Sequence, residues 1–122
     1  MARPANITTA LCLMLSVVCS ARGDSGTDWM GQYRPISAVC RGMNLVIVPH
    51  RLSYGDCVSV TYADLAATDG FAGRIDEHAH CALAGKVLTL APDGQGGNTL
   101  STFDTENAWH EKLPALVCSY AK

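Results

Sequence analysis

Residues 38–60 read AVCRGMNLVIVPHRLSYGDCVSV and contain two strand patterns separated by turn signals. The run Leu45–Val48 is apolar and rich in β-branched residues, and Pro49 ends it. After a second turn signal at residues 53–56, apolar and polar side chains alternate from Cys57 onward. β-Branched runs and strict alternation both favour extended chain, so this stretch predicts two consecutive strands, each beginning at or after a cysteine.

Four later segments also have strand character, and one segment has helical character. Residues 105–113 carry acids early, a lysine late and a proline directly after, which is typical of a short helix. The strand candidates are residues 71–76, 83–90, 100–103 and 116–120. Several short strands with few helical signals predict an all-β fold, either a small sandwich or a barrel.

The first 21 residues have the features of a secretory signal peptide. Arg3 is followed by an apolar core at residues 10–18, which is too short to cross a bilayer, and then by small residues. We expect cleavage before Arg22. The valine before Cys19 is a poor context for lipid attachment, so the expected product is secreted without a membrane anchor.

The segment that follows is polar and rich in glycine and serine. Residues 22–37 are therefore expected to form a mobile N-terminal arm that docks through the rings of Trp29 and Tyr33. The remaining chain is long enough for one domain with a modest core, which we place at residues 38–122.

Cleavage of the signal peptide would reduce the number of cysteines from six to four. An even number in a short exported chain indicates two disulfides among Cys40, Cys57, Cys81 and Cys118. A zinc site would need closely spaced cysteines, which the sequence lacks, so no metal and no other cofactor is expected. If Cys40 and Cys57 open neighbouring antiparallel strands, they lie at opposite ends and cannot pair, which leaves two pairings open.

The charges exclude one class of partner. Nine basic and eleven acidic residues are interleaved along the chain, without a basic stripe. The sequence therefore has no cluster of positive charge that would attract a nucleic acid or an anionic membrane, and neither is an expected partner.

The segment Glu77-His78-Ala79-His80 is the main candidate for a site. On a strand, His78 and His80 would project from one face and could share a metal. The alternative is a solvated polar loop before a crosslinked cysteine. We therefore assign Glu77, His78 and His80 only as a candidate surface site.

Catalysis would need partners from elsewhere in the chain. Arg74 with His50 or His110 could complete the acid, base and phosphate clamp of a small secreted ribonuclease. The sequence contains no nucleophile elbow, no H-E-x-x-H and no glycine-rich phosphate loop before a helix. No catalytic residue is assigned, and a binding module is the expected class.

The order of cysteines and strands resembles that of fungal MAX effectors, in particular the ToxB-type host-selective toxins. The resemblance covers residues 38–90, and the connection between Cys81 and Cys118 is longer than in that pattern. The matching pieces are Ala38-Val39-Cys40, the Leu45–Val48 strand, Gly55-Asp56-Cys57-Val58, and His80-Cys81 before a strand at residues 86–90.

The resemblance implies a sandwich of six antiparallel strands in two sheets. It also implies the pairing of Cys40 with Cys81 and of Cys57 with Cys118. It implies a monomeric virulence effector of a plant-infecting fungus, secreted and then able to enter host cells, which binds host proteins without catalysis. The alternative functions are a secreted inhibitor or small-ligand binder on a β scaffold, and a ribonuclease-like toxin.

Overall fold

The computed structural model describes residues 29–67 and 69–122. The predicted signal peptide (residues 1–21) and residues 22–28 of the predicted arm lie outside the described residues. The strands are β2 (Gly31–Pro35), β3 (Leu45–Val48), β4 (Arg51–Tyr54), β5 (Cys57–Asp64), β6 (Phe71–Ile75), β7 (Val87–Pro92), β8 (Asn98–Phe103) and β9 (Leu116–Ala121). A 3-10 helix, η3 (Ala38–Cys40), follows β2, and the α-helix α2 (Glu106–His110) follows β8.

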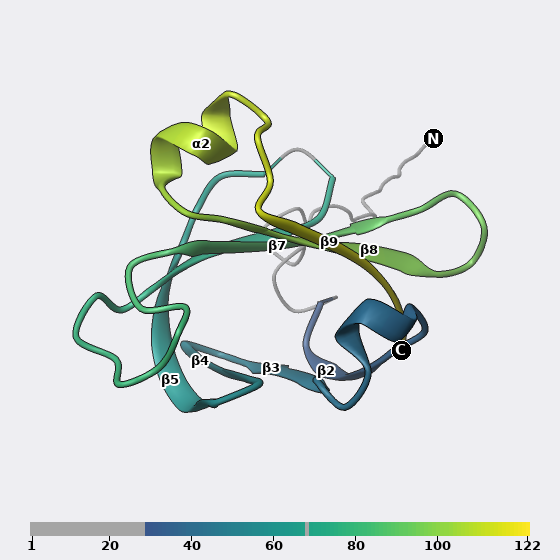
Figure 1. Ribbon diagram of the computed structural model, residues 1–122, viewed down its shortest axis with the longest axis horizontal. Coiled ribbons are helices and arrows are strands. Elements are labelled where there is room, and N and C mark those ends of the chain that lie inside the picture. The colour runs from purple at the N-terminus through teal and green to yellow at the C-terminus, as the bar shows by residue number, and fades with distance from the viewer. Residues whose placement is uncertain (1–28, 68) are drawn as a thin grey trace, which may run out of the picture.

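The strands form one closed antiparallel barrel. Each strand pairs with the strands before and after it in the sequence, and β9 returns to pair with β2. In Figure 1, β2, β3 and β4 form the lower wall and β7, β8 and β9 the upper wall, with β5 curving between them. The all-β class is confirmed, but the six-stranded sandwich is wrong, because the barrel has eight strands.

The two strands that the sequence did not predict are β2 and β4. The chain of β4 (RLSY) lies between turns at residues 49–50 and 55–56, so its four residues read as part of one long turn. In β2 (GQYRP), only Tyr33 has the apolar bulk of a strand residue. These two short strands convert the predicted sandwich into a closed barrel, and closure removes the exposed edges that a sandwich would retain.

The N-terminal part of the barrel corrects the prediction of a mobile arm. Within that arm, Gly31–Pro35 is a barrel strand that pairs with both β3 and β9. The side chain of Tyr33 is only 2% exposed, and its hydroxyl donates a hydrogen bond to the Trp29 carbonyl at 3.0 Å. Trp29 in turn packs against the core, of which Tyr33 is a member. The domain therefore begins before residue 38.

Side chains fill the inside of the barrel, as expected for eight strands. Tyr120 is fully buried, and its hydroxyl donates to the Met43 carbonyl at 2.6 Å; burial raises the pKa of this phenol far above its usual value. Tyr62 donates to the Val48 carbonyl at 2.9 Å. The core residues are Tyr33, Cys40, Leu45, Ile47, Leu52, Tyr54, Tyr62, Phe71, Ile75, Leu88, Leu90, Leu100, Cys118 and Tyr120.

Two disulfides cross-link the barrel, as predicted, but the implied pairing is wrong. The bonds join Cys40 to Cys118 and Cys57 to Cys81. Every second connection of an up-and-down barrel lies at the same end, so the β4–β5 turn meets the β6–β7 connection. Cys57 follows that turn and Cys81 lies in that connection, which brings their Cα atoms to 5.0 Å.

The other disulfide follows from the path of the chain after β2. Ser37 accepts a hydrogen bond from the Ser119 amide at 2.7 Å, so the chain stays against β9 and carries Cys40 to Cys118. The predicted absence of a bond between Cys40 and Cys57 is confirmed, although the reason given for it is wrong. Because β4 lies between β3 and β5, those two strands run in the same direction and do not pair.

Candidate functional site

A hollow of about 400 Å³ lies on the outer wall of the barrel, between α2 and the β5–β6 connection. We call it the α2 groove. Its floor is made by outward-facing residues of β6 and β7, since Ala72 lies opposite Thr89 while their neighbours Phe71 and Leu90 belong to the core. Ala91 continues the floor. These floor side chains are small, and they leave a trough that larger residues would fill.

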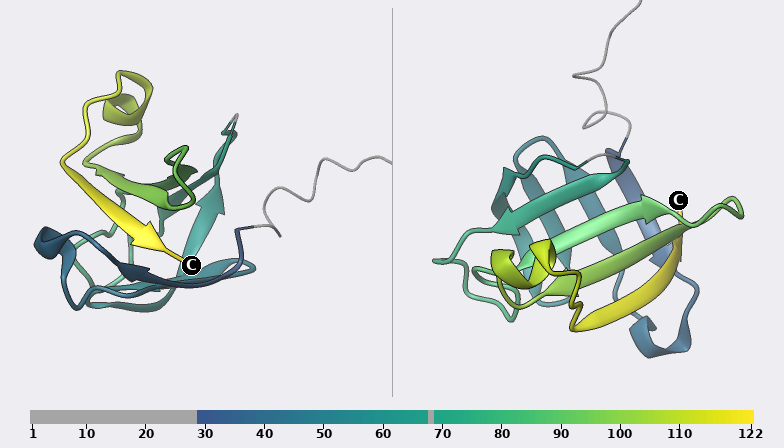
Figure 2. Two further views of the ribbon diagram at one scale, coloured as in Figure 1. Left: turned by 90° about the vertical axis from the view of Figure 1, so that its right-hand side faces the viewer. Right: turned by 90° about the horizontal axis from the view of Figure 1, so that it is seen from above.

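The two walls of the α2 groove differ. Trp109, His110 and Lys112 form the wall from α2, and Phe103 of β8 lies at its foot. In Figure 2, α2 stands away from the barrel wall rather than inside it. The facing wall belongs to the β5–β6 connection and includes Asp69.

A glycine allows the second wall to approach the floor. A Cβ atom on Gly70 would overlap the carbonyl oxygen of Leu90, and it would also meet Ala91. Only glycine therefore permits the β5–β6 connection to cross so close to β7.

The start of α2 is fixed by side chains. Thr105 caps the helix by accepting a hydrogen bond from the Ala108 amide at 2.9 Å. Glu106 pairs with Arg74 of β6, at 3.6 Å between Nε and Oε1, and lies 3.9 Å from Nε2 of His110. These contacts hold the wall that carries Trp109 against β6.

The end of α2 has an unusual residue. The Leu113 amide donates to the Ala108 carbonyl at 2.9 Å and the Lys112 amide to the Trp109 carbonyl at 3.1 Å. This is a Schellman motif, whose left-handed position usually holds glycine. Lys112 occupies it with φ of 59°, a conformation that a side chain destabilises by roughly 1 kcal/mol.

The residues predicted from the sequence as a surface site lie in the β6–β7 connection. The side chains of His78 and Glu77 are 85% and 70% exposed, with 3.7 Å between Nε2 and Oε2. His80 is also exposed and lines a separate hollow. They are polar residues on a solvated connection, as the alternative interpretation of this segment expected.

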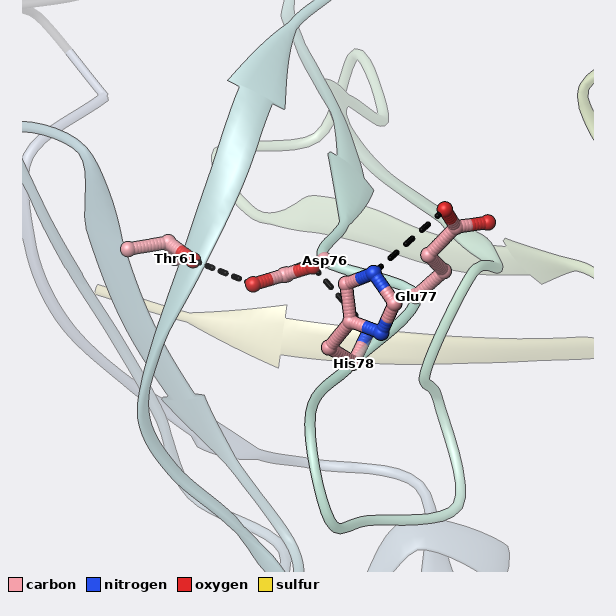
Figure 3. A network of polar contacts seen from close by, with 4 residues as sticks. All are labelled: Thr61, Asp76, Glu77 and His78. Carbon is pink, nitrogen blue, oxygen red and sulfur yellow. Dashed lines mark hydrogen bonds and ion pairs between the residues drawn. The ribbon is translucent and has the colours of Figure 1, made fainter.

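The polar contacts of this connection centre on Asp76, which sequence reasoning missed. Asp76 accepts hydrogen bonds from the Thr61 hydroxyl at 3.1 Å and from the His78 amide at 3.0 Å (Figure 3). The His78 amide is the main cause that holds the pKa of the Asp76 carboxyl below its ordinary value, and the Thr61 hydroxyl lowers that pKa further. The network fixes the start of the connection and the outer face of β5.

We expect Asp76→Asn to lower the melting temperature at pH 7, and the difference from the wild type to shrink as the pH falls and the Asp76 carboxyl becomes protonated. A carboxyl whose pKa is depressed on folding stabilises the fold above its unfolded pKa, and this contribution disappears as the pH falls below about 4. Thermal melts of both proteins between pH 2 and pH 7 measure the difference. Glu77→Gln is the control, with little expected effect; identical pH profiles for the wild type and Asp76→Asn would contradict the role of Asp76.

Metal binding by the predicted histidines has little geometric support. Within residues 29–67 and 69–122, Asp56, Cys57 and Cys81 form the one group of three potential ligand side chains that lie close together. Both cysteines of that group are joined in a disulfide and are not available as thiolate ligands. His78 and His80 belong to no such group in this part of the chain.

Comparisons with known proteins give no relative. No family model matches the chain, and no curated protein and no solved structure matches it either. None of the described helices is long and apolar enough to cross a membrane.

The α2 groove was not predicted, although its signals are present in the sequence. Residues 105–113 were correctly expected to contain a short helix, but nothing in that pattern shows that Trp109 faces the barrel. The signals in the sequence are the small residues Ala72, Thr89 and Ala91, together with a lysine where a helix end favours glycine.

Proposed function

We propose that this protein is a secreted, non-enzymatic binding protein that holds a small apolar ligand in the α2 groove. One observation carries the proposal: Trp109 and Phe103 stand beside a floor of small side chains on an outer wall, where the barrel interior is already filled. The volume of about 400 Å³ lies within the range of small-molecule sites, which is about 300–1,000 Å³.

Secretion is supported by the covalent structure. Two disulfides persist in an oxidising compartment and are rare in the cytosol. They agree with the signal peptide that the sequence predicts at residues 1–21.

Binding is favoured over catalysis because two residues of the ribonuclease alternative meet only at an exposed ion pair. Arg74 and His110 do meet, but at Glu106, whose charge ties α2 to β6. The side chains of Arg74, Glu106 and His110 are 44%, 45% and 63% exposed, so water surrounds them.

We propose a small ligand as the binding partner, whereas the resemblance to fungal effectors implied a host protein. The effector function was implied by the resemblance to MAX effectors, and two structural features of that resemblance, six strands and the disulfide pairing, are wrong for this chain. A small-ligand binder on a β scaffold was the alternative expectation, and the α2 groove is the feature that supports it.

We expect Trp109→Ala to weaken binding of N-phenyl-1-naphthylamine, a neutral apolar fluorophore, by about tenfold. The tryptophan offers the largest apolar surface of the groove, and a tenfold loss corresponds to about 1.4 kcal/mol of buried contact. The increase in fluorescence on titration measures the affinity.

The control truncates an apolar side chain elsewhere on the barrel. Val58 is 75% exposed on β5 and does not line the α2 groove, so Val58→Ala should leave the affinity unchanged. Equal affinities in the wild type and Trp109→Ala, with both proteins folded by circular dichroism, would refute binding in the groove.

A further inference from the structure

We propose that the ligand of the α2 groove is a short apolar peptide with free termini, its carboxylate bound at Lys112 and its ammonium at Asp69. This inference rests on the proposed function and names the class of ligand. It is carried by the charges of the two walls, by the backbone conformation of Lys112 and by the length of the floor.

The charges of the two walls are opposite. The cation is Lys112, on the α2 side, and the anion is Asp69, on the side of the β5–β6 connection. The floor between them is formed by Ala72, Thr89 and Ala91. A ligand that matches this groove has an apolar body, an anionic group at one side and a cationic group at the other, as a peptide of apolar residues does.

Lys112 occupies a backbone position that favours glycine, at the edge of the α2 groove. Glycine would occupy the left-handed position at the end of α2 without strain, whereas Lys112 has φ of 59° there. Strained backbone conformations gather at binding sites, where the side chain is needed for function. A carboxylate of the ligand gives the lysine such a function.

The floor limits the length of the peptide. Phe103 lies opposite Val87 in the β7–β8 pair, and Ala91 lies four residues further along β7. Four residues of strand extend about 13 Å, which matches an extended peptide of three or four residues. The groove therefore suits a tripeptide better than a folded partner.

The test uses trileucine as the probe and Trp109 as the reporter. The chain contains two tryptophans, so Trp29→Phe leaves Trp109, which lines the groove, as the only tryptophan of the protein. We expect saturable quenching with trileucine, and at least tenfold weaker binding of trileucine amide. We expect N-acetyl-trileucine to bind several-fold more weakly than trileucine.

Two glycine substitutions separate binding from stability. His50 lies in the β3–β4 turn with φ of 69°, outside the α2 groove, so it shares the left-handed conformation of Lys112. We expect Lys112→Gly and His50→Gly each to raise the melting temperature by several degrees. Only Lys112→Gly should also weaken trileucine binding, by about tenfold, and it should leave the affinity for the amide unchanged.

Asp69→Asn completes the design, because it should weaken binding of trileucine but not of its N-acetyl derivative. Equal affinities for trileucine, its amide and its N-acetyl derivative would overturn this inference, as would full affinity in Lys112→Gly. If N-phenyl-1-naphthylamine still binds in a Trp109-dependent manner while no peptide does, the proposed function stands and the peptide inference fails. If binding of N-phenyl-1-naphthylamine does not depend on Trp109 and trileucine does not quench Trp109, both fail.

Discussion

A chain that begins at Ala38 is expected not to fold, because it lacks β2. That strand pairs with β3 through residues 31–33 and with β9 through residues 34–35, so its loss opens the barrel and leaves two unpaired edges. Removal of the Tyr33 side chain alone should destabilise the fold by about 3–5 kcal/mol, since large buried aromatic side chains have this effect. A domain of this size has only about 5–15 kcal/mol of stability in total.

The control is a chain that begins at Trp29, which keeps β2 and the contact between Trp29 and the Tyr33 hydroxyl. We expect it to show a cooperative thermal transition and a near-ultraviolet circular dichroism spectrum of ordered aromatic rings. The shorter chain should show neither. Equal melting temperatures for the two chains would contradict the closed barrel and restore the interpretation of residues 31–37 as a mobile arm.

The sequence predicted the strands whose pattern is strong in itself. Leu45–Val48 and the alternating run from Cys57 have enough apolar bulk to be recognised without a neighbour. β2 is different, because Gly31–Pro35 becomes a strand only through pairing with β3 and β9 on its two sides. The residue pattern of a short segment reflects the conformational preference of that segment alone. Closure of a barrel depends instead on pairing between segments that are far apart in the sequence.

The candidate site likewise has a part that the sequence predicted and a part that it did not. The exposure of Glu77 and His78 follows from their polar sequence, and it was expected as one of two interpretations. The α2 groove joins a helix of five residues to a connection that lies about forty residues earlier in the chain. Such a site depends on which outward faces are neighbours, and that information is in the register of β6, β7 and β8.

The largest single destabilisation that we expect from substitution is the loss of the bond between Cys40 and Cys118. Its sequence separation of 78 corresponds to about 4.5 kcal/mol in the chain-entropy model, against about 3.4 kcal/mol for the separation of 24 between Cys57 and Cys81. Cys40 and Cys118 also belong to the core, so truncation there removes buried contacts as well. The double variant Cys40→Ala/Cys118→Ala should therefore melt at least 15 °C below the wild type, if each kcal/mol shifts the transition by about 4–8 °C.

The matched control is Cys57→Ala/Cys81→Ala, which should be destabilised less because its loop is shorter and Cys81 is only half-buried. The pairing itself is tested by tryptic mapping without reduction, since cleavage after lysine and arginine places each of the four cysteines on a separate peptide. We expect the peptide with Cys40 to be joined to the peptide with Cys118. Joining of the Cys40 peptide to the Cys81 peptide would contradict the barrel, because η3 is held against β9 by the hydrogen bond from the Ser119 amide to Ser37.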